Sequence, residues 1–199
     1  NIVRAFKKND TKCTKYSKNQ KNKEELSMNR LKGKIAVITG GNSGVGAATA
    51  KLFAAEGATV VITARREAAL KEVADEITAA GGEVYAVSTD ISKPEDPEML
   101  MQKVMDKYGK IDILVNNAGI LEQGLKPIDK FLDEDMDRII ETNEKGTMRC
   151  MRAASKRMTA GGAIVNVASV AGEKGCGGAA YVASKAAVIG LTKHTALRF

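Results

Sequence analysis

Apolar residues follow two different spacings along the chain from Leu31 onward. Short runs rich in Val, Ile and Ala are typical of buried strands, and longer stretches with apolar residues three and four positions apart are typical of helices. The runs predict strands over residues 35–39, 59–63, 84–88, 111–115 and 163–168. The helical spacing predicts helices over residues 44–55, 67–80, 97–108 and 133–158, and from residue 181 to the end.

The alternation of strands and helices predicts an α/β fold. Strands that are apolar almost throughout are covered on both faces, as in parallel sheets flanked by helices. With right-handed crossovers such a chain forms a Rossmann-type, doubly wound parallel sheet, and we expect the strand order 3-2-1-4-5. The chain has 199 residues, of which 44% are hydrophobic, and this is enough for one sizeable core. We therefore expect one domain over residues 31–199.

Most of the net charge of +7 is concentrated in the first thirty residues. Residues 1–30 hold nine Lys or Arg and three Asp or Glu, so the rest of the chain holds 22 basic and 21 acidic residues. A Lys- and Asn-rich segment with almost no apolar periodicity is typical of disorder. It has neither interleaved aromatic residues nor an amphipathic face, so we expect no nucleic acid and no membrane as a partner. We interpret residues 1–30 as a disordered basic tail.

Three cysteines, Cys13, Cys150 and Cys176, are scattered along the chain. Their odd number and the lack of a C-x-x-C pair argue against a disulfide framework and against a structural metal site, so we expect no metal. Free cysteines suit a reducing compartment, and we expect a cytoplasmic protein. No apolar stretch approaches the roughly 20 residues of a membrane-spanning helix.

A glycine-rich segment joins the first predicted strand to the first predicted helix. It reads Thr-Gly-Gly-Asn-Ser-Gly-Val-Gly over Thr39–Gly46, with the spacing G-x-x-x-G-x-G. Glycines there permit a tight turn and the close approach of a pyrophosphate, which binds the outward N–H groups of a helix N-terminus. A simple turn also uses glycines, but the strand–turn–helix context favours dinucleotide binding. The residues expected to contact the cofactor are Thr39, Gly40, Asn42, Ser43, Gly44, Val45 and Gly46.

Two arginines stand where a dinucleotide-binding protein reads the adenosine ribose, about twenty residues further on at the end of the second strand. An acid there would accept a hydrogen bond from the ribose 2′-hydroxyl, but this chain has Arg65 and Arg66. Two cations suit a 2′-phosphate, so NADP is favoured as the cofactor, with NAD as the alternative. The other interpretation is that both arginines are solvated charges at the start of a helix.

Tyr181 and Lys185 are four residues apart in the last predicted helix and therefore share one face. A phenol has a pKa of about 10, too high for efficient proton transfer near neutrality, and a nearby ammonium group favours the phenolate. Ser169 follows the fifth strand, at the edge of the sheet where ligands of parallel α/β folds bind, and its hydroxyl could hold a substrate oxygen. Alone, a Y-x-x-x-K spacing is more often a solvated helix face.

Taken together, these motifs resemble the short-chain dehydrogenase/reductase family. The motifs that carry the resemblance are, in chain order, Thr39–Gly46, Asp90, Asn116–Gly119 (Asn-Asn-Ala-Gly), Asn143 before Gly146, Ser169, and Tyr181 with Lys185. The resemblance extends from about Leu31 to Phe199 in the family's order and spacing. It implies an NAD(P)-dependent enzyme that interconverts a secondary alcohol and a ketone by hydride transfer.

The resemblance also implies a role for each residue. Tyr181 would be the general acid/base, and Ser169 would orient the substrate carbonyl. Lys185 would hold the nicotinamide ribose and favour the phenolate, and Asn143 would position a water for a proton relay. The other residues implied to contact the cofactor are Asp90 at the adenine, and Asn116, Ala118 and Gly119 in the turn beside it.

Family members continue with further strands and a substrate lid, so the resemblance implies that the domain over residues 31–199 is incomplete, with its final strands absent. It also implies a small-molecule alcohol or ketone as the substrate, and a homodimer or homotetramer. Substrates of 3-oxoacyl, sugar and hydroxysteroid type all occur in the family. The segments 120–130 and 172–180 are expected to select among them.

Other functions stay open at this point: a non-catalytic dinucleotide-binding or sensing protein, an inactive fragment, and a sugar-nucleotide epimerase, which also uses Y-x-x-x-K. A pure sensor has no need of the proton donor that the Ser/Tyr/Lys set provides. The glycine spacing and the Asn-Asn-Ala-Gly segment argue against the epimerase.

Overall fold

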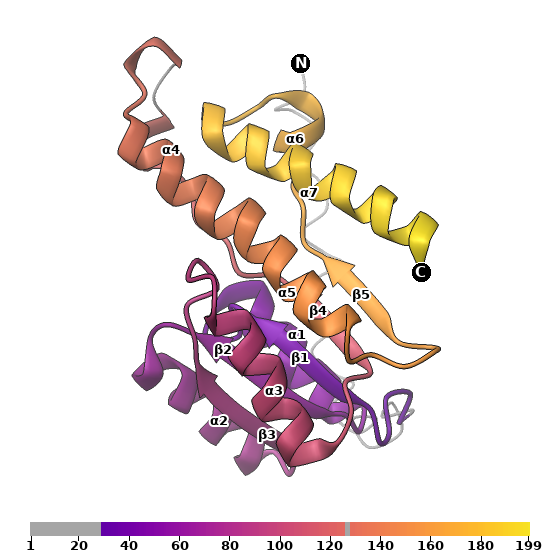
Figure 1. The fold of residues 1–199 in the computed structure, drawn as a ribbon. Coiled ribbons are helices and arrows are strands. Elements are labelled where there is room, and N and C mark those ends of the chain that lie inside the picture. Colours follow the sequence, from indigo (N-terminus) through magenta and orange to yellow (C-terminus); the bar gives the residue numbers. More distant parts are fainter. Residues whose placement is uncertain (1–28, 126–127) are drawn as a thin grey trace, which may run out of the picture.

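Five parallel strands form one sheet, with helices on both of its faces (Figure 1). The computed structural model describes residues 29–125 and 128–199, so the predicted disordered tail lies outside the described residues except for Asn29 and Arg30. The strands are β1 (Ile35–Thr39), β2 (Thr59–Ala64), β3 (Glu83–Ser88), β4 (Ile113–Asn116) and β5 (Ala163–Asn166). The α-helices are α1 (Gly44–Ala55), α2 (Glu67–Ala79), α3 (Asp96–Tyr108), α4 (Asp133–Ile139), α5 (Thr147–Ser155), α6 (Ala171–Lys174) and α7 (Ala179–Arg198). Two short 3-10 helices, η3 (Gln123–Leu125) and η4 (Ile128–Lys130), and a π-helix, η5 (Ile140–Gly146), complete the described elements.

The strand order is β3-β2-β1-β4-β5, and every neighbouring pair is parallel. In the centre, Val37 of β1 lies beside Val61 of β2 and Leu114 of β4. The predicted Rossmann-type, doubly wound order is therefore confirmed. Because all strands run the same way, their carboxyl ends and the loops that follow lie along one edge of the sheet.

Side chains of β1 alternate between two buried layers, which explains why the whole strand is apolar up to its last residue. Ile35 and Val37 pack with residues of α3 and α5, whereas Ala36 and Ile38 pack with residues of α1 and α2. All five residues of β1 are buried. This central strand therefore fixes the position of the glycine-rich turn that follows it.

The helix predicted as continuous over residues 133–158 is interrupted, and that prediction is wrong in its interior. α4 ends at Ile139, the π-helix η5 covers Ile140–Gly146, and α5 follows from Thr147. A π-turn inserts an extra residue into the helix, often at a functional site. Within it Gly146 lies so close to Ile91 that a Cβ there would be 2.9 Å from the Ile91 side chain.

The last predicted strand, over residues 163–168, also ends earlier than expected. β5 stops at Asn166. Val167 still donates its N–H to the Asn116 carbonyl, but its own carbonyl accepts a hydrogen bond from Lys185 Nζ at 2.8 Å. The chain then turns into the short helix α6, which the hydrophobic pattern did not predict.

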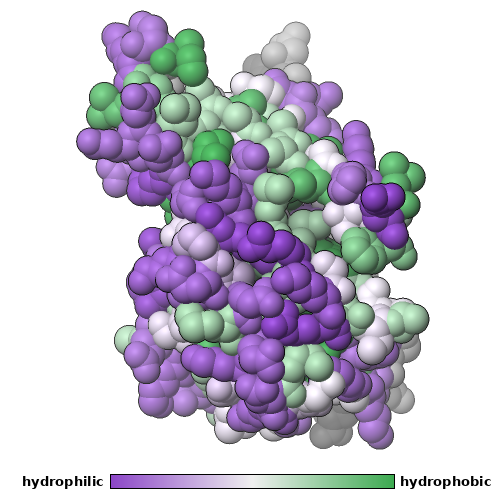
Figure 2. Space-filling model, viewed as in Figure 1, coloured by the Kyte–Doolittle hydropathy of each residue, from purple (hydrophilic) through white to green (hydrophobic). Residues whose placement is uncertain are grey.

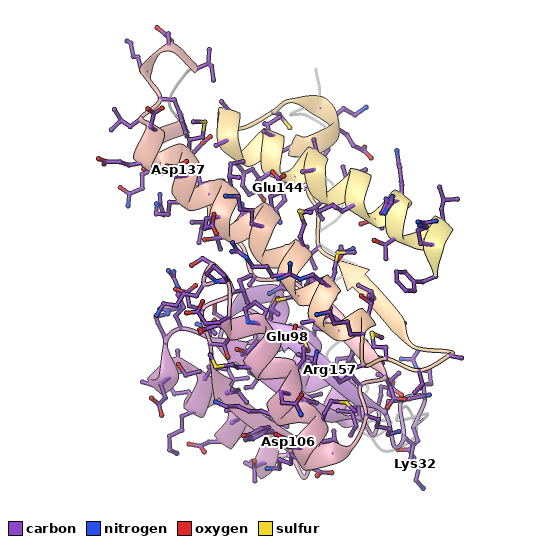
Figure 3. All side chains as sticks on the ribbon, in the orientation of Figure 1. Lys32, Glu98, Asp106, Asp137, Glu144 and Arg157 are labelled. Carbon is purple, nitrogen blue, oxygen red and sulfur yellow. The ribbon has the colours of Figure 1, made fainter. Side chains whose placement is uncertain are left out.

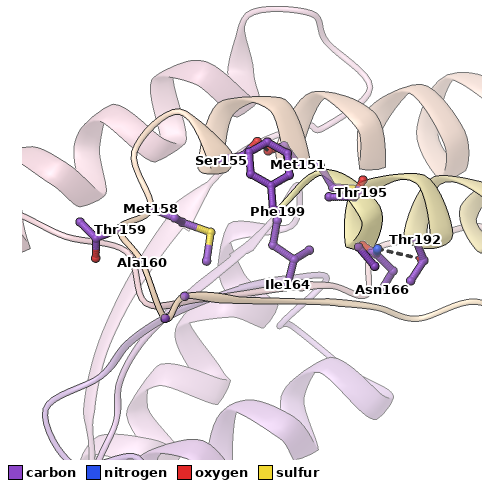
Figure 4. A pocket seen from close by; sticks show the side chains of 13 residues that line it. Met151, Ser155, Met158, Thr159, Ala160, Ile164, Asn166, Thr192, Thr195 and Phe199 are labelled. Atoms are coloured by element: carbon purple, nitrogen blue, oxygen red, sulfur yellow. Dashed lines mark hydrogen bonds between the residues drawn. The ribbon is translucent and has the colours of Figure 1, made fainter.

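A groove of about 370 Å³ lies between β5, α5 and α7 (Figure 4). Ile164 and Asn166 of β5 line it together with Phe199, and Asn166 Nδ2 donates to Thr192 Oγ1 of α7 at 2.9 Å. Figure 2 shows apolar residues gathered on the side where β5 and the end of α7 lie. On the opposite face of the strand Val165 is 49% exposed. β5 is thus the edge of the described sheet, with incomplete cover on both faces.

Ion pairs join the start of the described chain to Glu56 and join Arg157, after α5, to α3. Arg30 donates to Glu56 at 2.7 Å, so this residue of the predicted tail contacts the folded part of the chain. Arg157 and Glu98 of α3 point toward one another and pair at 2.8 Å (Figure 3), and the Arg157 guanidinium lowers the pKa of Glu98. Across the described residues, no helix combines the length and apolarity needed to cross a bilayer.

Candidate active site

The glycine-rich segment forms a tight turn between β1 and α1. Gly40 and Gly44 have φ angles of 67° and 53°, a left-handed conformation that favours glycine. Gly46 packs directly against the Gly40 carbonyl, so a side chain at this position would collide with the backbone. Asn117, from the segment after β4, donates through Nδ2 to the carbonyls of Thr39 at 3.0 Å and Gly40 at 3.2 Å. Close backbone approach therefore determines the shape of this turn.

Thr39 joins the same turn to the segment after β4. Its Oγ1 accepts hydrogen bonds from the N–H groups of Asn117 and Ala118, both at 3.0 Å. Asn116 points elsewhere: it is buried, and its Nδ2 donates to Asn166 Oδ1 at 2.8 Å. The two asparagines of the Asn-Asn-Ala-Gly segment thus have different contacts: Asn117 bonds to the glycine-rich turn, and Asn116 joins β4 to β5.

A cleft of about 110 Å³ opens where these two segments meet. It is lined by Gly40, Asn42, Thr63, Ala64, Arg65, Thr89, Asp90, Ile91, Ala118, Gly119, Ile120 and Thr142. Thr63 is 1% exposed, and its hydroxyl has no hydrogen-bond partner among the described residues. A buried polar atom of this kind calls for a partner such as a bound group. The cleft and the adjoining N-terminus of α1 fit the adenosine and phosphates of a dinucleotide.

Apart from Tyr181 and Lys185 of α7, the residues predicted to contact a cofactor fall into three groups. Those that line the cleft are Gly40, Asn42, Arg65, Asp90, Ala118 and Gly119. Those exposed at or beside the first turn of α1 are Ser43, Gly44 and Val45. The others are outside the cleft lining: Thr39, Gly46 and Asn116 are buried, and Arg66 is exposed at the start of α2.

Asp90 is held in place by hydrogen bonds from its own turn. Its Oδ1 accepts from the N–H of Ser92 at 3.1 Å and from the Ser92 hydroxyl at 2.7 Å, and its N–H donates to Asp96 at 2.9 Å. Arg65 lies across the cleft at the end of β2, with an exposed side chain and its carbonyl hydrogen-bonded by Ser88. Of the two predicted arginines, Arg65 is the one that the structure brings to the cleft.

The first turns of α7 carry Tyr181 and Lys185 on one face, as the spacing predicts. Lys185 Nζ lies 5.7 Å from the centre of the Tyr181 ring and donates to the Val167 carbonyl after β5. The Lys185 side chain is buried, and burial lowers its pKa below the ordinary value for lysine. Tyr181 is half-buried. An ammonium group is therefore fixed beside a phenol that solvent can still reach.

Asn143, in the π-helix η5, links three parts of the site. It is fully buried, its Oδ1 accepts from the Ile120 N–H at 2.8 Å, and its Nδ2 donates to the Ile120 carbonyl at 2.9 Å. Nδ2 also donates to Ser184 Oγ at 3.2 Å. Gly119 lies against both Asn143 and Lys185, where a Cβ would be 3.3 Å and 3.5 Å from their polar atoms. Asn143 thereby connects the loop after β4 to α7.

Ser169 lies between β5 and α6 and is half-buried. Its Oγ accepts a hydrogen bond from the Ala171 N–H at 3.2 Å. Within the part of the chain that the structure describes, no hydrogen bond joins Ser169 to Tyr181. Both residues stand at the carboxyl edge of the sheet, so the hydroxyl of Ser169 is available there to a substrate oxygen.

Sequence reasoning missed three polar groups at this site: Thr63, Asn117 and Glu122. Asn117 belongs to the Asn-Asn-Ala-Gly motif, but the sequence does not show that its side chain lies against the Thr39–Gly46 turn. Thr63 and Glu122 carry no motif, and only burial without a partner distinguishes them. Across residues 29–125 and 128–199, no cluster of three or more His, Cys, Asp and Glu side chains has the arrangement of metal ligands.

Comparison with known proteins gives a family match over most of the chain. The family described as short chain dehydrogenase matches residues 34–199. A 3beta-hydroxysteroid dehydrogenase from Mediterraneibacter gnavus is 42% identical over 174 residues, which are 86% of this chain and 63% of that protein. A 3-oxoacyl-[acyl-carrier-protein] reductase from Synechocystis is 40% identical over 173 residues, covering 85% of this chain and 69% of that protein. The chain thus spans less than two thirds of the length of the first of these relatives.

Solved structures resemble the described fold closely. A short chain dehydrogenase from Burkholderia cenocepacia in complex with NADP superimposes with a TM-score of 0.80 at 36% identity, covering 85% of this chain and 69% of that one. A short chain dehydrogenase from Mycobacterium smegmatis gives the same TM-score at 37% identity, with 84% of this chain and 72% of that one covered.

Proposed function

Because this chain belongs to the short-chain dehydrogenase/reductase family, we propose that the protein transfers a hydride between a nicotinamide cofactor and a secondary alcohol or ketone. The observation that carries the proposal is the cluster at the start of α7, where buried Lys185 lies 5.7 Å from the Tyr181 ring. Residues from other parts of the chain contact this helix. Asn143 bonds to both Ile120 and Ser184, and Gly119 lies against Asn143 and Lys185. Residues 31–199 would act as one dinucleotide-binding and catalytic domain.

The cofactor would lie along the carboxyl edge of the sheet. Its adenosine would occupy the cleft beside Arg65 and Asp90, and its phosphates would meet the N–H groups at the start of α1. A side chain at Gly40 or Gly46 would collide with neighbouring protein atoms, so both glycines are needed for the turn that leads into α1. The nicotinamide ring supplies or accepts the hydride when bound, which no protein side chain can do.

NADP is our proposed choice between the two nicotinamide cofactors. Arg65 lines the cleft and has an exposed side chain. The other cleft residues from the end of β2 are Thr63 and Ala64, and neither is an acid. A guanidinium suits the charge and geometry of a 2′-phosphate. A related structure contains NADP, which agrees with this choice.

The chain's own residues would move the proton that accompanies the hydride. Tyr181 would donate its phenolic proton to the carbonyl oxygen during reduction, and would receive one from the alcohol during oxidation. Ser169 would hold that oxygen by a hydrogen bond. Lys185 would stabilise the phenolate electrostatically and contact the nicotinamide ribose. Asn143 would maintain this arrangement and position a relay water.

The substrate class is the finer part of the proposal. Relatives are named for 3beta-hydroxysteroids and for 3-oxoacyl groups on an acyl carrier protein, so both classes are candidates, together with sugars. Segments 120–130 and 172–180 would choose among them. We also propose a homodimer or homotetramer in the cytoplasm, because family members oligomerise and the cysteines are scattered.

The test is a panel of secondary alcohols and ketones incubated with the full-length gene product, with NADPH oxidation or NADP reduction followed by absorbance. Turnover by the unmodified protein is expected, and Tyr181→Phe should lose most of kcat while binding the cofactor almost normally. A removed catalytic proton donor typically reduces the rate by about 10²- to 10⁴-fold. Cofactor binding without turnover on any substrate would favour the sensing protein instead, and retained turnover in Tyr181→Phe would reject the proposed proton donor.

A further inference from the structure

Glu122 is a buried carboxylate with no partner. It lies in the loop after β4, is 5% exposed, and neither Oε1 nor Oε2 has a hydrogen-bond partner among the described residues. No ion pair within 29–125 and 128–199 includes it. A polar group taken from water without a compensating hydrogen bond destabilises the folded state, and a charged one does so strongly. A buried polar group without a partner therefore calls for an explanation, such as a ligand that it binds.

Gly178 provides the space that Glu122 occupies. Gly178 is the N-cap of α7, with φ of −75° and ψ of 152°, a conformation open to any residue. Its backbone therefore does not require glycine. A Cβ at this position would overlap the Glu122 carboxyl group. The absence of a side chain at residue 178 is explained by the carboxylate of Glu122.

The pair joins the two segments that flank the proposed catalytic group. Two residues before Glu122, Ile120 is hydrogen-bonded in both directions by Asn143. Three residues after Gly178, Tyr181 begins the catalytic face of α7. The carboxylate is thus fixed between the loop after β4 and the helix that carries the proposed proton donor.

No N–H group of α7 donates a hydrogen bond to the Glu122 carboxylate, whose two oxygens have no partner among the described residues. α7 has 20 residues, and the N–H groups of its first turn carry partial positive charge. Lys185, whose ammonium group lies near the Tyr181 ring, donates to the Val167 carbonyl. What the two oxygens of Glu122 lack is hydrogen bonds. A carboxylate is an acceptor only, so its missing partner must be an O–H or N–H group.

We propose that Glu122 is a specificity-determining residue whose carboxylate accepts a hydrogen bond from a hydroxyl group of the substrate, so that the protein prefers hydroxylated ketones and alcohols to their apolar analogues. This inference rests on the proposed function, since it places the substrate beside Tyr181. Sites built to hydrogen-bond a substrate group discriminate strongly against analogues that lack it, because their own buried polar groups are then left unpaired.

The test compares cyclohexanone with its 2-, 3- and 4-hydroxy derivatives and with 4-aminocyclohexanone, using the full-length gene product and NADPH. For at least one hydroxyl position, kcat/KM should exceed that of cyclohexanone by about tenfold or more, the effect of one hydrogen bond to a charged group. In Glu122→Leu this ratio should fall to within about twofold of unity, and in Glu122→Gln, which keeps only a neutral and weaker acceptor, it should fall to about half or less of its original value. Partial misfolding of a variant cancels in the ratio, and if Glu122→Leu does not fold, Glu122→Gln still decides.

Glu173→Gln is the matched control, because it removes an exposed carboxylate of α6 in the same part of the chain. It should leave the ratio unchanged. Equal losses on hydroxylated and plain ketones in Glu122→Gln would show a capping role for α7 only, and would overturn the proposal. A stronger preference for 4-aminocyclohexanone than for any hydroxyketone would overturn it too, in favour of a cationic substrate.

A binding measurement separates this inference from the proposed function. Calorimetric titration of trans-1,4-cyclohexanediol and cyclohexanol in the presence of the oxidised cofactor requires no turnover. Tighter binding of the diol by the unmodified protein, weakened in Glu122→Gln and lost in Glu122→Leu, would support the inference even if no ketone were reduced. Equal binding of the two ligands, with normal ketone reduction, would overturn the inference and leave the proposed function intact.

Discussion

Arg65 and Arg66 differ in position although they are neighbours with the same charge. Arg65 lines the cleft at the end of β2, whereas Arg66 is the exposed N-cap of α2 and lies outside the cleft lining. A charge-assisted bond to a phosphate requires the guanidinium within contact distance. The sequence could indicate a basic pair at the ribose position, but the choice between its members depends on where β2 ends and α2 begins.

We predict that Arg65→Asp weakens NADPH binding by roughly 10- to 100-fold and improves the relative binding of NADH, because it replaces a phosphate-binding cation by an acceptor for the ribose hydroxyl. The measurement is the dissociation constant of each cofactor by calorimetry. Arg66→Asp, with the same change in charge, should alter the NADPH constant by no more than about threefold. Similar effects of both variants would mean that the overall charge, and not one contact, selects the cofactor.

At the scale of the elements, polar side chains fix where strands begin, and the hydrophobic pattern does not reveal these side chains. The starts of β1 and β4 meet at Asp112, whose Oδ2 accepts from the Ile35 N–H at 2.8 Å and from Lys110 Nζ at 2.9 Å. Burial raises the pKa of Asp112, but the Ile35 hydrogen bond and the nearby ammonium groups outweigh it, so its net pKa lies below the ordinary value.

We predict that Asp112→Ala lowers the free energy of unfolding by roughly 1–3 kcal/mol at neutral pH, because it leaves the Ile35 N–H without its acceptor. A carboxyl group with a lowered pKa stabilises the fold above its unfolded pKa of about 3.9, and this stabilisation disappears as the pH falls through the folded value. The difference between variant and unmodified protein should therefore shrink on acidification, as measured by urea unfolding across that range. Asp75→Ala removes one partner of an exposed helix pair, and should cost about 0.5 kcal/mol or less. Equal effects of the two variants would contradict the structural role given to Asp112.

The hydrophobic pattern predicted element types well because each type has its own period, and it failed where a side chain overrides that period. β1 and α1 have the predicted bounds. In the long helix, residues 140–146 form a π-turn around Asn143 and its bonds to Ile120. β5 is shorter than its apolar run because Lys185 takes the Val167 carbonyl. These contacts join residues 18 or more positions apart, which local periodicity cannot detect.

For the whole molecule, the sheet order and the position of the site at its carboxyl edge could be predicted from connectivity rules alone. The Tyr181/Lys185 pair followed from helical spacing. Glu122 could not, because a lone glutamate in a loop is usually solvated, and its burial depends on Gly178 more than fifty residues later in the chain. A polar residue becomes informative only when the structure shows whether it has a partner.

The edge of the described sheet determines how these 199 residues should behave when expressed by themselves. β5 pairs with β4 on one side only, and Val165 is 49% exposed. Its free N–H and C=O groups, beside the apolar groove and the 88% exposed Phe199, form a template for pairing with another chain. We predict that the chain expressed alone self-associates through β5 while it still binds the cofactor in the cleft beside Gly40.

Val165→Lys should reduce this self-association, because a charge on an edge strand opposes strand pairing between molecules. Sedimentation velocity at increasing protein concentration measures the change, and cofactor titration shows that the cleft is intact. Val170→Lys introduces the same charge at a position that is 63% exposed but lies beyond the strand, and it should leave association unchanged. If both variants reduce association equally, added charge alone improves the solubility of the chain. If neither does, the contact between molecules lies away from β5.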